Sequence, residues 1–219
     1  MQSELFSDPP ANVDLGPGAR LLAGFALDGA DALVAAVERI AAAAPFRHLV
    51  TPGGRRMSVA MTNAGALGWV SDAAGYRYEP SDPQTGRRWP AMPPAFARLA
   101  EAAAAAVGFP GFAPDACLIN RYQPGARLTL HRDQDEYDLG APIVSVSLGL
   151  PATFLWGGLH RTDRARRLTL RHGDVVVWGG ASRLVYHGIA PLGSGNHPLT
   201  GAARLNLTFR RARKDATDP

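Results

Sequence analysis

The sequence has one cysteine, Cys117, and one lysine, Lys214. A single thiol excludes an internal disulfide and gives no basis for a thiolate metal site, which favours a reducing cytoplasm. No apolar run is long enough to cross a bilayer, and the N-terminus is acidic and proline-rich rather than basic and then apolar. We therefore expect a soluble cytoplasmic protein with no membrane partner.

Basic residues outnumber acidic ones, and all but one of the 23 Lys and Arg residues are arginine. The net charge of +4 and the pI of about 9.7 favour a polyanionic partner, although the codon bias of an Ala- and Arg-rich genome explains them equally well. A chain of 219 residues that is 46% hydrophobic can bury the core of one domain. We expect a single domain over residues 1–219 that is a monomer.

Two Ala-rich segments, residues 28–44 and 93–107, are predicted to be amphipathic helices because apolar side chains recur on one face of each. The first face comprises Leu33, Val34, Val37, Ile40 and Ala41, and the second comprises Phe96, Leu99 and Ala103. Between the helices, residues 51–89 are rich in Gly, Pro, Asn and aromatic residues without a clean period. That composition indicates hairpins and long loops, which often line binding sites.

From Cys117 onward the sequence consists of short apolar runs separated by Gly, Pro and Asp turns. Such runs predict strands, and their close spacing favours a jelly roll. Within this region, residues 168–178 predict a hairpin with Gly173 and Asp174 at its turn. No repeat or linker interrupts the chain, which supports one mainly β domain.

A candidate metal site is formed by His131, Asp133 and His187. The first two are two residues apart, so on an extended strand both side chains leave the same face. His187, at the end of another predicted strand, completes the two imidazoles and one carboxylate that suit non-haem Fe(II) oxygenases. Three protein ligands leave room for a bidentate 2-oxo acid and dioxygen. His-x-Asp alone is common, however, and a lone strand histidine is more often packed than metallated.

The segment RLNLTFR, residues 204–210, raises the odds of such a site. Arg204, Asn206, Thr208 and Arg210 alternate with apolar residues and therefore share one strand face. Two arginines on one face would cost dearly if buried unpaired, so the site should hold an anion such as the dicarboxylate 2-oxoglutarate. The alternative is an amphipathic edge strand that keeps both arginines in solvent.

The chain resembles the AlkB group of Fe(II)/2-oxoglutarate dioxygenases over nearly its whole length. The matching segments are FRHLVTPGG, SVAMTNAGALGWV, GYRY, RRWPAMP, PDACLINRYQPGARLTLHRDQDE, APIVSVSLGLPATF, HGDVVVWGGASRLVYHGI and RLNLTFR. The resemblance implies a mainly β fold with flanking helices. A double-stranded β-helix (jelly-roll) catalytic core would span about residues 115–213, and an N-terminal nucleotide-recognition lid about residues 46–92.

The resemblance also implies a role for individual residues. Iron would be bound, and the catalytic centre formed, by His131, Asp133 and His187. The cosubstrate 2-oxoglutarate would be bound by Asn120, Tyr122, Arg204, Asn206 and Arg210, with Arg204 on its distal carboxylate and Arg210 near the chelating one. The substrate would be bound by Thr51, Met61, Trp69, Tyr76, Asp135 and Arg161. Departures from the family pattern fall at Arg127, Arg132 and Gln134, so the phosphate contacts stay open.

Among the substrate residues, Trp69 and the His131 ring would sandwich the damaged base, and Asp135 would meet its exocyclic amine. An alkylated adenine or cytosine is cationic, so an aromatic face attracts it and a carboxylate neutralises it. From the residues alone, Asp135 and Glu136 could equally be solvated charges after a strand. Of Tyr76 and Tyr78, only one is expected to face the ligand.

The implied activity is oxidative demethylation, a direct-reversal repair of DNA damage. Bases such as 1-methyladenine and 3-methylcytosine in single-stranded DNA, or RNA, would be restored with release of formaldehyde, succinate and CO2. The cofactors would be Fe(II), 2-oxoglutarate and O2, although Mn, Co or Ni could occupy the same ligands. Two alternatives stay open: an Fe(II)/2-oxoglutarate hydroxylase of a protein or small-molecule substrate, and a non-catalytic metal-binding jelly-roll module.

Overall fold

A computed structural model of the chain describes residues 11–213. The N-terminal part contains β1 (Val13–Gly16), β2 (Ala19–Leu22), η1 (Leu27–Gly29), α1 (Ala30–Ala43), β3 (Arg47–Val50), β4 (Arg56–Gly65), β5 (Gly68–Asp72), β6 (Gly75–Glu79) and α2 (Pro94–Ala105). The C-terminal part contains β7 (Ala116–Tyr122), β8 (Leu128–His131), β9 (Ile143–Gly149), β10 (Ala152–Trp156), β11 (Arg166–Leu170), β12 (Val175–Trp178), η2 (Gly180–Ser182), β13 (His187–Ile189) and β14 (Arg204–Arg210). Both predicted helices are confirmed, each slightly shorter than expected.

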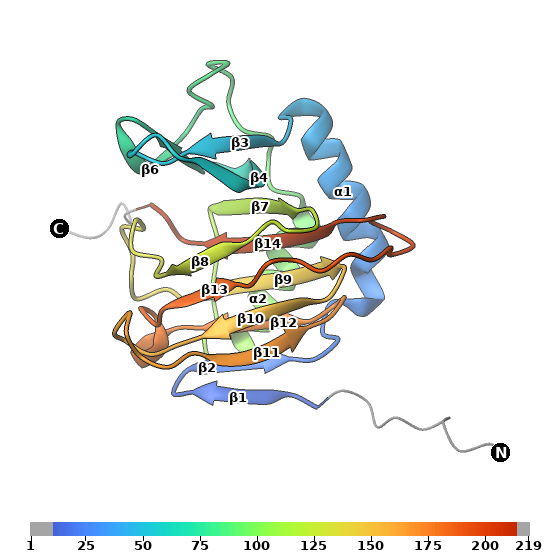
Figure 1. Ribbon diagram of the computed structural model, residues 1–219, viewed down its shortest axis with the longest axis vertical. Coiled ribbons are helices and arrows are strands. Elements are labelled where there is room, and N and C mark those ends of the chain that lie inside the picture. The colour runs from blue at the N-terminus through green and yellow to red at the C-terminus, as the bar shows by residue number, and fades with distance from the viewer. Residues whose placement is uncertain (1–10, 214–219) are drawn as a thin grey trace.

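The strands form two facing sheets and one separate hairpin (Figure 1). The large sheet has the order β1-β2-β12-β9-β14-β7-β4-β3, and the small sheet has the order β11-β10-β13-β8. Strands β5 and β6 pair only with each other. Two antiparallel sheets with flanking helices confirm the predicted jelly-roll architecture. Strand β4, from the segment predicted to be loops and hairpins, and β3, just before that segment, extend the large sheet beside β7.

The prediction of a hairpin over residues 168–178 is wrong. The turn exists, with Gly173 at φ +84° and the Asp174 N–H donating to the Arg171 carbonyl. However, β11 pairs with β10 in the small sheet, whereas β12 pairs with β2 and β9 in the large one. The turn residues specify a reversal of direction. Which strand each one pairs with depends on the burial of its apolar side chains against segments that are distant in the sequence. This segment therefore carries the chain from one sheet to the other.

Apolar side chains form two layers of core on either side of the large sheet. On one side, α1 and α2 pack against residues of β9, β12 and β14. On the other side, the large sheet packs against residues of the small sheet, including Phe154 and Trp156 of β10. Strand β14 lies between β7 and β9, and all of its residues are buried. The alternative of an exposed edge strand for RLNLTFR is therefore wrong.

The helix layer depends on Phe209, which is 0% exposed and meets Phe96 of α2 edge-to-face with ring centroids 5.8 Å apart. Substituting Phe209 by alanine is expected to lower the free energy of unfolding by about 3–5 kcal/mol, because apolar burial is lost and neighbouring side chains fill such a cavity only in part. Urea denaturation measures this change. Thr169→Ala on the exposed face of β11 is the control and should change it by less than about 0.5 kcal/mol. A loss below about 1 kcal/mol for Phe209→Ala would contradict this packing.

Among residues 11–213, no helix is both long and apolar enough to span a bilayer.

Candidate active site

Two histidines from neighbouring strands face each other in the space between the sheets. His131 ends β8, and His187 begins β13 rather than ending a strand as predicted; the two residues pair across the strands. The Nδ1 atom of each ring lies 2.9–3.0 Å from a backbone carbonyl two residues earlier, that of Thr129 or Val185. A carbonyl can only accept, so each Nδ1 carries the proton and each Nε2 has a free lone pair. Both rings are thus prepared as ligands through Nε2.

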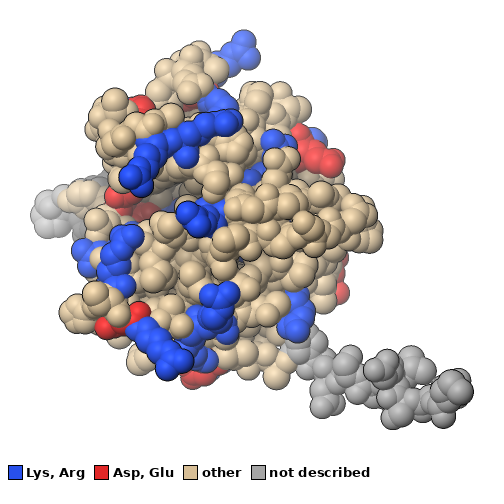
Figure 2. Space-filling model, in the orientation of Figure 1, with Lys and Arg blue, Asp and Glu red and all other residues tan. Residues whose placement is uncertain are grey.

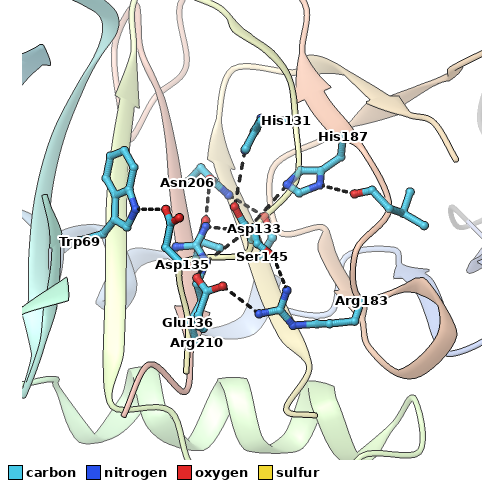
Figure 3. A network of polar contacts seen from close by, with 12 residues as sticks. Trp69, His131, Asp133, Asp135, Glu136, Ser145, Arg183, His187, Asn206 and Arg210 are labelled. Carbon is cyan, nitrogen blue, oxygen red and sulfur yellow. Dashed lines mark hydrogen bonds and ion pairs between the residues drawn. The ribbon is translucent and has the colours of Figure 1, made fainter. Parts of the chain in front are cut away.

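Asp133 completes the cluster from the loop after β8, not from the strand itself. Its Oδ1 lies 3.7 Å from Nε2 of His131, and its Oδ2 lies 3.9 Å from Nε2 of His187. The ligand atoms of all three residues lie within 4.8 Å of one another. Figure 3 shows the three side chains converging from different segments. Two imidazoles and one carboxylate at this spacing fit a divalent ion such as Fe(II).

The protonation states of the cluster also suit a metal. Burial alone would raise the pKa of Asp133, but Arg210 and the two histidines outweigh it and hold the pKa well below its usual value. Burial, followed by the nearby His131, lowers the pKa of His187 to about 4. At neutral pH Asp133 is therefore anionic and His187 neutral, which are the forms that bind metal.

Arg210 is the direct partner of Asp133. Its Nη2 and Nε donate to Asp133 Oδ2 at 2.7 and 3.1 Å, and its Nε also lies 3.2 Å from Oε1 of Glu136. These carboxylates outweigh burial and raise the pKa of Arg210. Arg210 is therefore positively charged, and the carboxylates of Asp133 and Glu136 balance that charge within the protein.

Arg204 is in the opposite situation. It is only 1% exposed, and its Nη2 donates to Ser147 Oγ at 2.9 Å while the guanidinium lies 5.0 Å from the centre of the Tyr122 ring. Its Nε and Nη1 have no hydrogen-bond partner, and no carboxylate pairs with it, among the residues that the structure describes. Burial lowers its pKa. A buried guanidinium with two unsatisfied donor nitrogens is suited to bind an anionic ligand.

A ladder of hydrogen-bonded amides and hydroxyls lies between the two arginines of β14. Asn120 donates to Asn206 Oδ1 at 3.3 Å, and Thr208 donates to the same oxygen at 3.1 Å. The Asn206 amide donates to Ser145 Oγ at 2.8 Å, and Asn120 Oδ1 remains without a partner in the described chain. This ladder can supply neutral hydrogen bonds to a bound anion.

The metal cluster, the arginines and the ladder open into one cavity of about 750 Å³, a size typical of small-ligand sites. All residues predicted for metal, cosubstrate and substrate line it: Thr51, Met61, Trp69, Tyr76, Asn120, Tyr122, His131, Asp133, Asp135, Arg161, His187, Arg204, Asn206 and Arg210. The structure therefore brings every predicted site residue together. Arg127, Arg132 and Gln134, whose roles were left open, line the same cavity.

Trp69 of β5 forms one wall of the cavity. Its indole N–H donates to Asp135 Oδ2 at 2.9 Å, and its ring stacks on Tyr76 with centroids 5.5 Å apart and an interplanar angle of 13°. Tyr76 is exposed, whereas the hydroxyl of Tyr78 points inward to Glu136. As expected, only one of the two tyrosines lines the cavity.

Several residues of the site were missed from the sequence. Glu136 is buried rather than solvated and is bound by Arg183, Arg210 and Tyr78. Nothing local signals this, because its partners come from distant segments. Ser145 and Ser147 could have been found, since they alternate with apolar residues along β9 as the polar residues of β14 do.

Comparison with known proteins agrees with this geometry. Residues 18–210 match the family model described as the 2OG-Fe(II) oxygenase superfamily. The chain is 59% identical to the Alpha-ketoglutarate-dependent dioxygenase AlkB of Escherichia coli (strain K12), over 96% of this chain and 98% of that protein. The chain belongs to the AlkB family. It is therefore an Fe(II)- and 2-oxoglutarate-dependent dioxygenase, which confirms the predicted enzyme class and cofactors.

Two other members of the AlkB family extend the comparison. The solved structure of OsALKBH1 superposes with a TM-score of 0.80 at 30% identity, covering 92% of this chain and all of that one. The Nucleic acid dioxygenase ALKBH1 of Mus musculus is 36% identical over 56% of this chain and 31% of its own length. With membership of the AlkB family, the alternative of a non-catalytic module is no longer supported.

Proposed function

We propose that this AlkB-family enzyme removes alkyl groups oxidatively from damaged bases of nucleic acids. The observation that carries the proposal is the content of one cavity: a metal cluster, an unpaired buried guanidinium, and an aromatic ring beside a carboxylate at the rim. The first two serve the cosubstrates, and the third suits a flat cation. The mouse relative is named a nucleic acid dioxygenase, which adds support.

In this proposal His131, Asp133 and His187 would hold iron through the free Nε2 atoms and the carboxylate. Bound iron would supply the oxidising chemistry, in which O2 and 2-oxoglutarate are consumed and succinate and CO2 are formed. Arg204 would bind the distal carboxylate of 2-oxoglutarate through Nε and Nη1, the two nitrogens without partners. Asn120, Tyr122 and Asn206 complete the cosubstrate's contacts, and Arg210 keeps Asp133 anionic and oriented.

The damaged base would stack on Trp69, opposite the His131 ring, with Asp135 near its exocyclic amine. The positive charge of N-alkylated adenine or cytosine strengthens both contacts and distinguishes the damaged base from a neutral one. Hydroxylation of the N-methyl carbon gives an unstable product that releases formaldehyde and the restored base. Thr51, Met61, Tyr76 and Arg161 would border the rest of the nucleotide.

The mouth of the cavity is basic. Arg55, Arg56, Arg127, Arg132 and Arg161 line it, and none forms an ion pair within residues 11–213. Figure 2 shows basic side chains on both sides of the hollow on this face. Such a rim suits a phosphate backbone. A base must leave its stack to enter the cavity, so single-stranded DNA or RNA should be the better substrate.

We further propose one domain, in which residues 46–92 act as a nucleotide-recognition lid and residues 115–213 as the catalytic core. The large sheet supports a single domain because it combines strands from β1 to β14. We propose a monomer that works in the cytoplasm, where the thiol of Cys117 stays reduced.

The test is mass spectrometry of a single-stranded oligonucleotide that carries one 1-methyladenine or 3-methylcytosine. It is incubated with the enzyme, Fe(II), ascorbate and O2, with and without 2-oxoglutarate. Loss of the methyl group only in the presence of 2-oxoglutarate is the expected result. Succinate formation with an untouched oligonucleotide would instead favour a hydroxylase of a protein or small-molecule substrate.

Trp69→Ala is expected to raise the KM for the methylated oligonucleotide by about 10- to 100-fold, because stacking a base on an aromatic ring contributes about 1–3 kcal/mol. Succinate formation without oligonucleotide should stay unchanged, since Trp69 is not a partner of the arginines or the metal cluster. Steady-state assays of formaldehyde and succinate measure both. Trp69→Phe keeps an aromatic face and should lose less; equal losses would mean that the hydrogen bond to Asp135, not stacking, is what matters.

A further inference from the structure

The hairpin of β5 and β6 is attached to the metal-binding loop by two side-chain hydrogen bonds. Trp69 and Tyr78 are directly opposite each other across the hairpin, so their side chains lie on the same face. Trp69 Nε1 donates to Asp135 at 2.9 Å, and the Tyr78 hydroxyl donates to Glu136 Oε1 at 2.6 Å. The hairpin shares no strand pairing with either main sheet, although Asn63 and Ser71 side chains join it to β4 and β3. The bonds of Trp69 and Tyr78 are what join it to the loop after β8.

Glu136 is the centre of this connection. It is 6% exposed, and besides Tyr78 its carboxylate contacts Arg183 Nη2 at 3.0 Å and Arg210 Nε at 3.2 Å. Both oxygens of this buried carboxylate are therefore engaged, Oε1 by Tyr78 and Arg210 and Oε2 by Arg183. None of these partners comes from the loop that carries Glu136.

The same two arginines hold the iron ligand. Arg183 Nη1 donates to the backbone carbonyl of Asp133 at 2.8 Å, and Arg210 donates to its carboxylate. Asp133 lies outside the strands, so no sheet hydrogen bonds fix it. Figure 3 shows Glu136 and Arg183 below the metal cluster and Trp69 to its left, bonded to Asp135. A continuous path of hydrogen bonds and ion pairs therefore runs from Tyr78 through Glu136 to both the main chain and the side chain of Asp133.

We propose that Glu136 is a positioning residue that couples the place of the Trp69 hairpin to the geometry of the iron ligand Asp133, with Tyr78 as its link to the hairpin. The inference rests on the proposed function in taking Asp133 as an iron ligand and the hairpin as the wall that receives the base. Filling the metal site then orders the hairpin, and by reciprocity a base held by the hairpin favours the productive place of Asp133.

The proposal is tested without nucleic acid by amide hydrogen exchange of residues 68–79. Mn(II) with 2-oxoglutarate, under nitrogen, is added to the full chain in place of Fe(II). Wild-type hairpin amides should exchange more slowly once the site is filled. In Tyr78→Phe, which removes only the hydroxyl, exchange should be about tenfold faster or more, and the response to Mn(II) should disappear.

Tyr76→Phe is the matched control for exchange, because Tyr76 is on the same strand and contributes its ring to the stack with Trp69. It should keep the wild-type response. If exchange is faster in Tyr78→Phe but still slows fully on addition of Mn(II), the hydroxyl is only structural and the proposal is overturned. The proposal is also overturned if Mn(II) does not slow exchange of the wild-type hairpin.

A second measurement separates binding from turnover. Tyr78→Phe should raise the KM for methylated oligonucleotide about tenfold while succinate formation without oligonucleotide stays within about twofold of wild type.

Glu136→Gln keeps the shape of the side chain but removes the negative charge that balances Arg183 and Arg210, so Mn(II) affinity should fall about tenfold or more. Unchanged Mn(II) affinity would overturn the role of Glu136. If the wild-type enzyme leaves the oligonucleotide untouched, the proposed function fails, yet the exchange experiment still decides the coupling.

Discussion

Asp133→Ala is expected to lower the rate of succinate formation from 2-oxoglutarate by more than about 100-fold. Even outer partners of metal ligands typically contribute about 10- to 100-fold, and Asp133 is the only anionic member of the cluster. Without it, His131 and His187 alone would have to hold the ion. Succinate formation at saturating Fe(II) and titration with Mn(II) measure the two parts of this effect.

Asp133→Asn guards against a folding defect, because it keeps an oxygen for Arg210 and the size of the side chain. It should fold and still lose most of its metal affinity. Asp28→Ala, an exposed carboxylate in η1, is the control and should behave as wild type. Substantial turnover by Asp133→Ala would show that the iron is held elsewhere.

Arg204→Leu should have opposite effects on ligand binding and on stability. The KM for 2-oxoglutarate is expected to rise by roughly 100-fold, since two charge-assisted hydrogen bonds from Nε and Nη1 are lost, worth about 3 kcal/mol together. In the ligand-free protein Arg204 is a buried charge without a counter-ion, so its removal relieves a desolvation cost. The free energy of unfolding without ligand should therefore stay the same or increase.

Arg183→Leu is the matched comparison, because Arg183 is equally buried but is paired with Glu136. Breaking that pair should cost about 3–5 kcal/mol of stability. Urea denaturation of both variants without ligand gives the contrast. If Arg204→Leu destabilises the protein as much as Arg183→Leu does, Arg204 has an anionic partner before 2-oxoglutarate binds, and its assignment to the cosubstrate would be wrong.

The residues proposed to carry the chemistry could be predicted from the sequence because their pattern is local. His131 and Asp133 are near neighbours, and the alternation of RLNLTFR places Arg204, Asn206 and Arg210 on one face of any strand. The jelly-roll class followed from the spacing of short apolar runs. The AlkB resemblance supplied the roles, and the structure places all of these residues around one cavity.

What the sequence could not determine are the partners of charges and strands. The turn at Gly173 marks a reversal in the sequence, but only the packing of two sheets decides that β11 and β12 join different ones. Glu136 resembles a solvated charge until Arg183, Tyr78 and Arg210 surround it from distant segments. Alternation along one strand specifies which face a side chain occupies, whereas burial and charge pairing depend on contacts between segments far apart in the chain, and those exist only once the sheets have assembled.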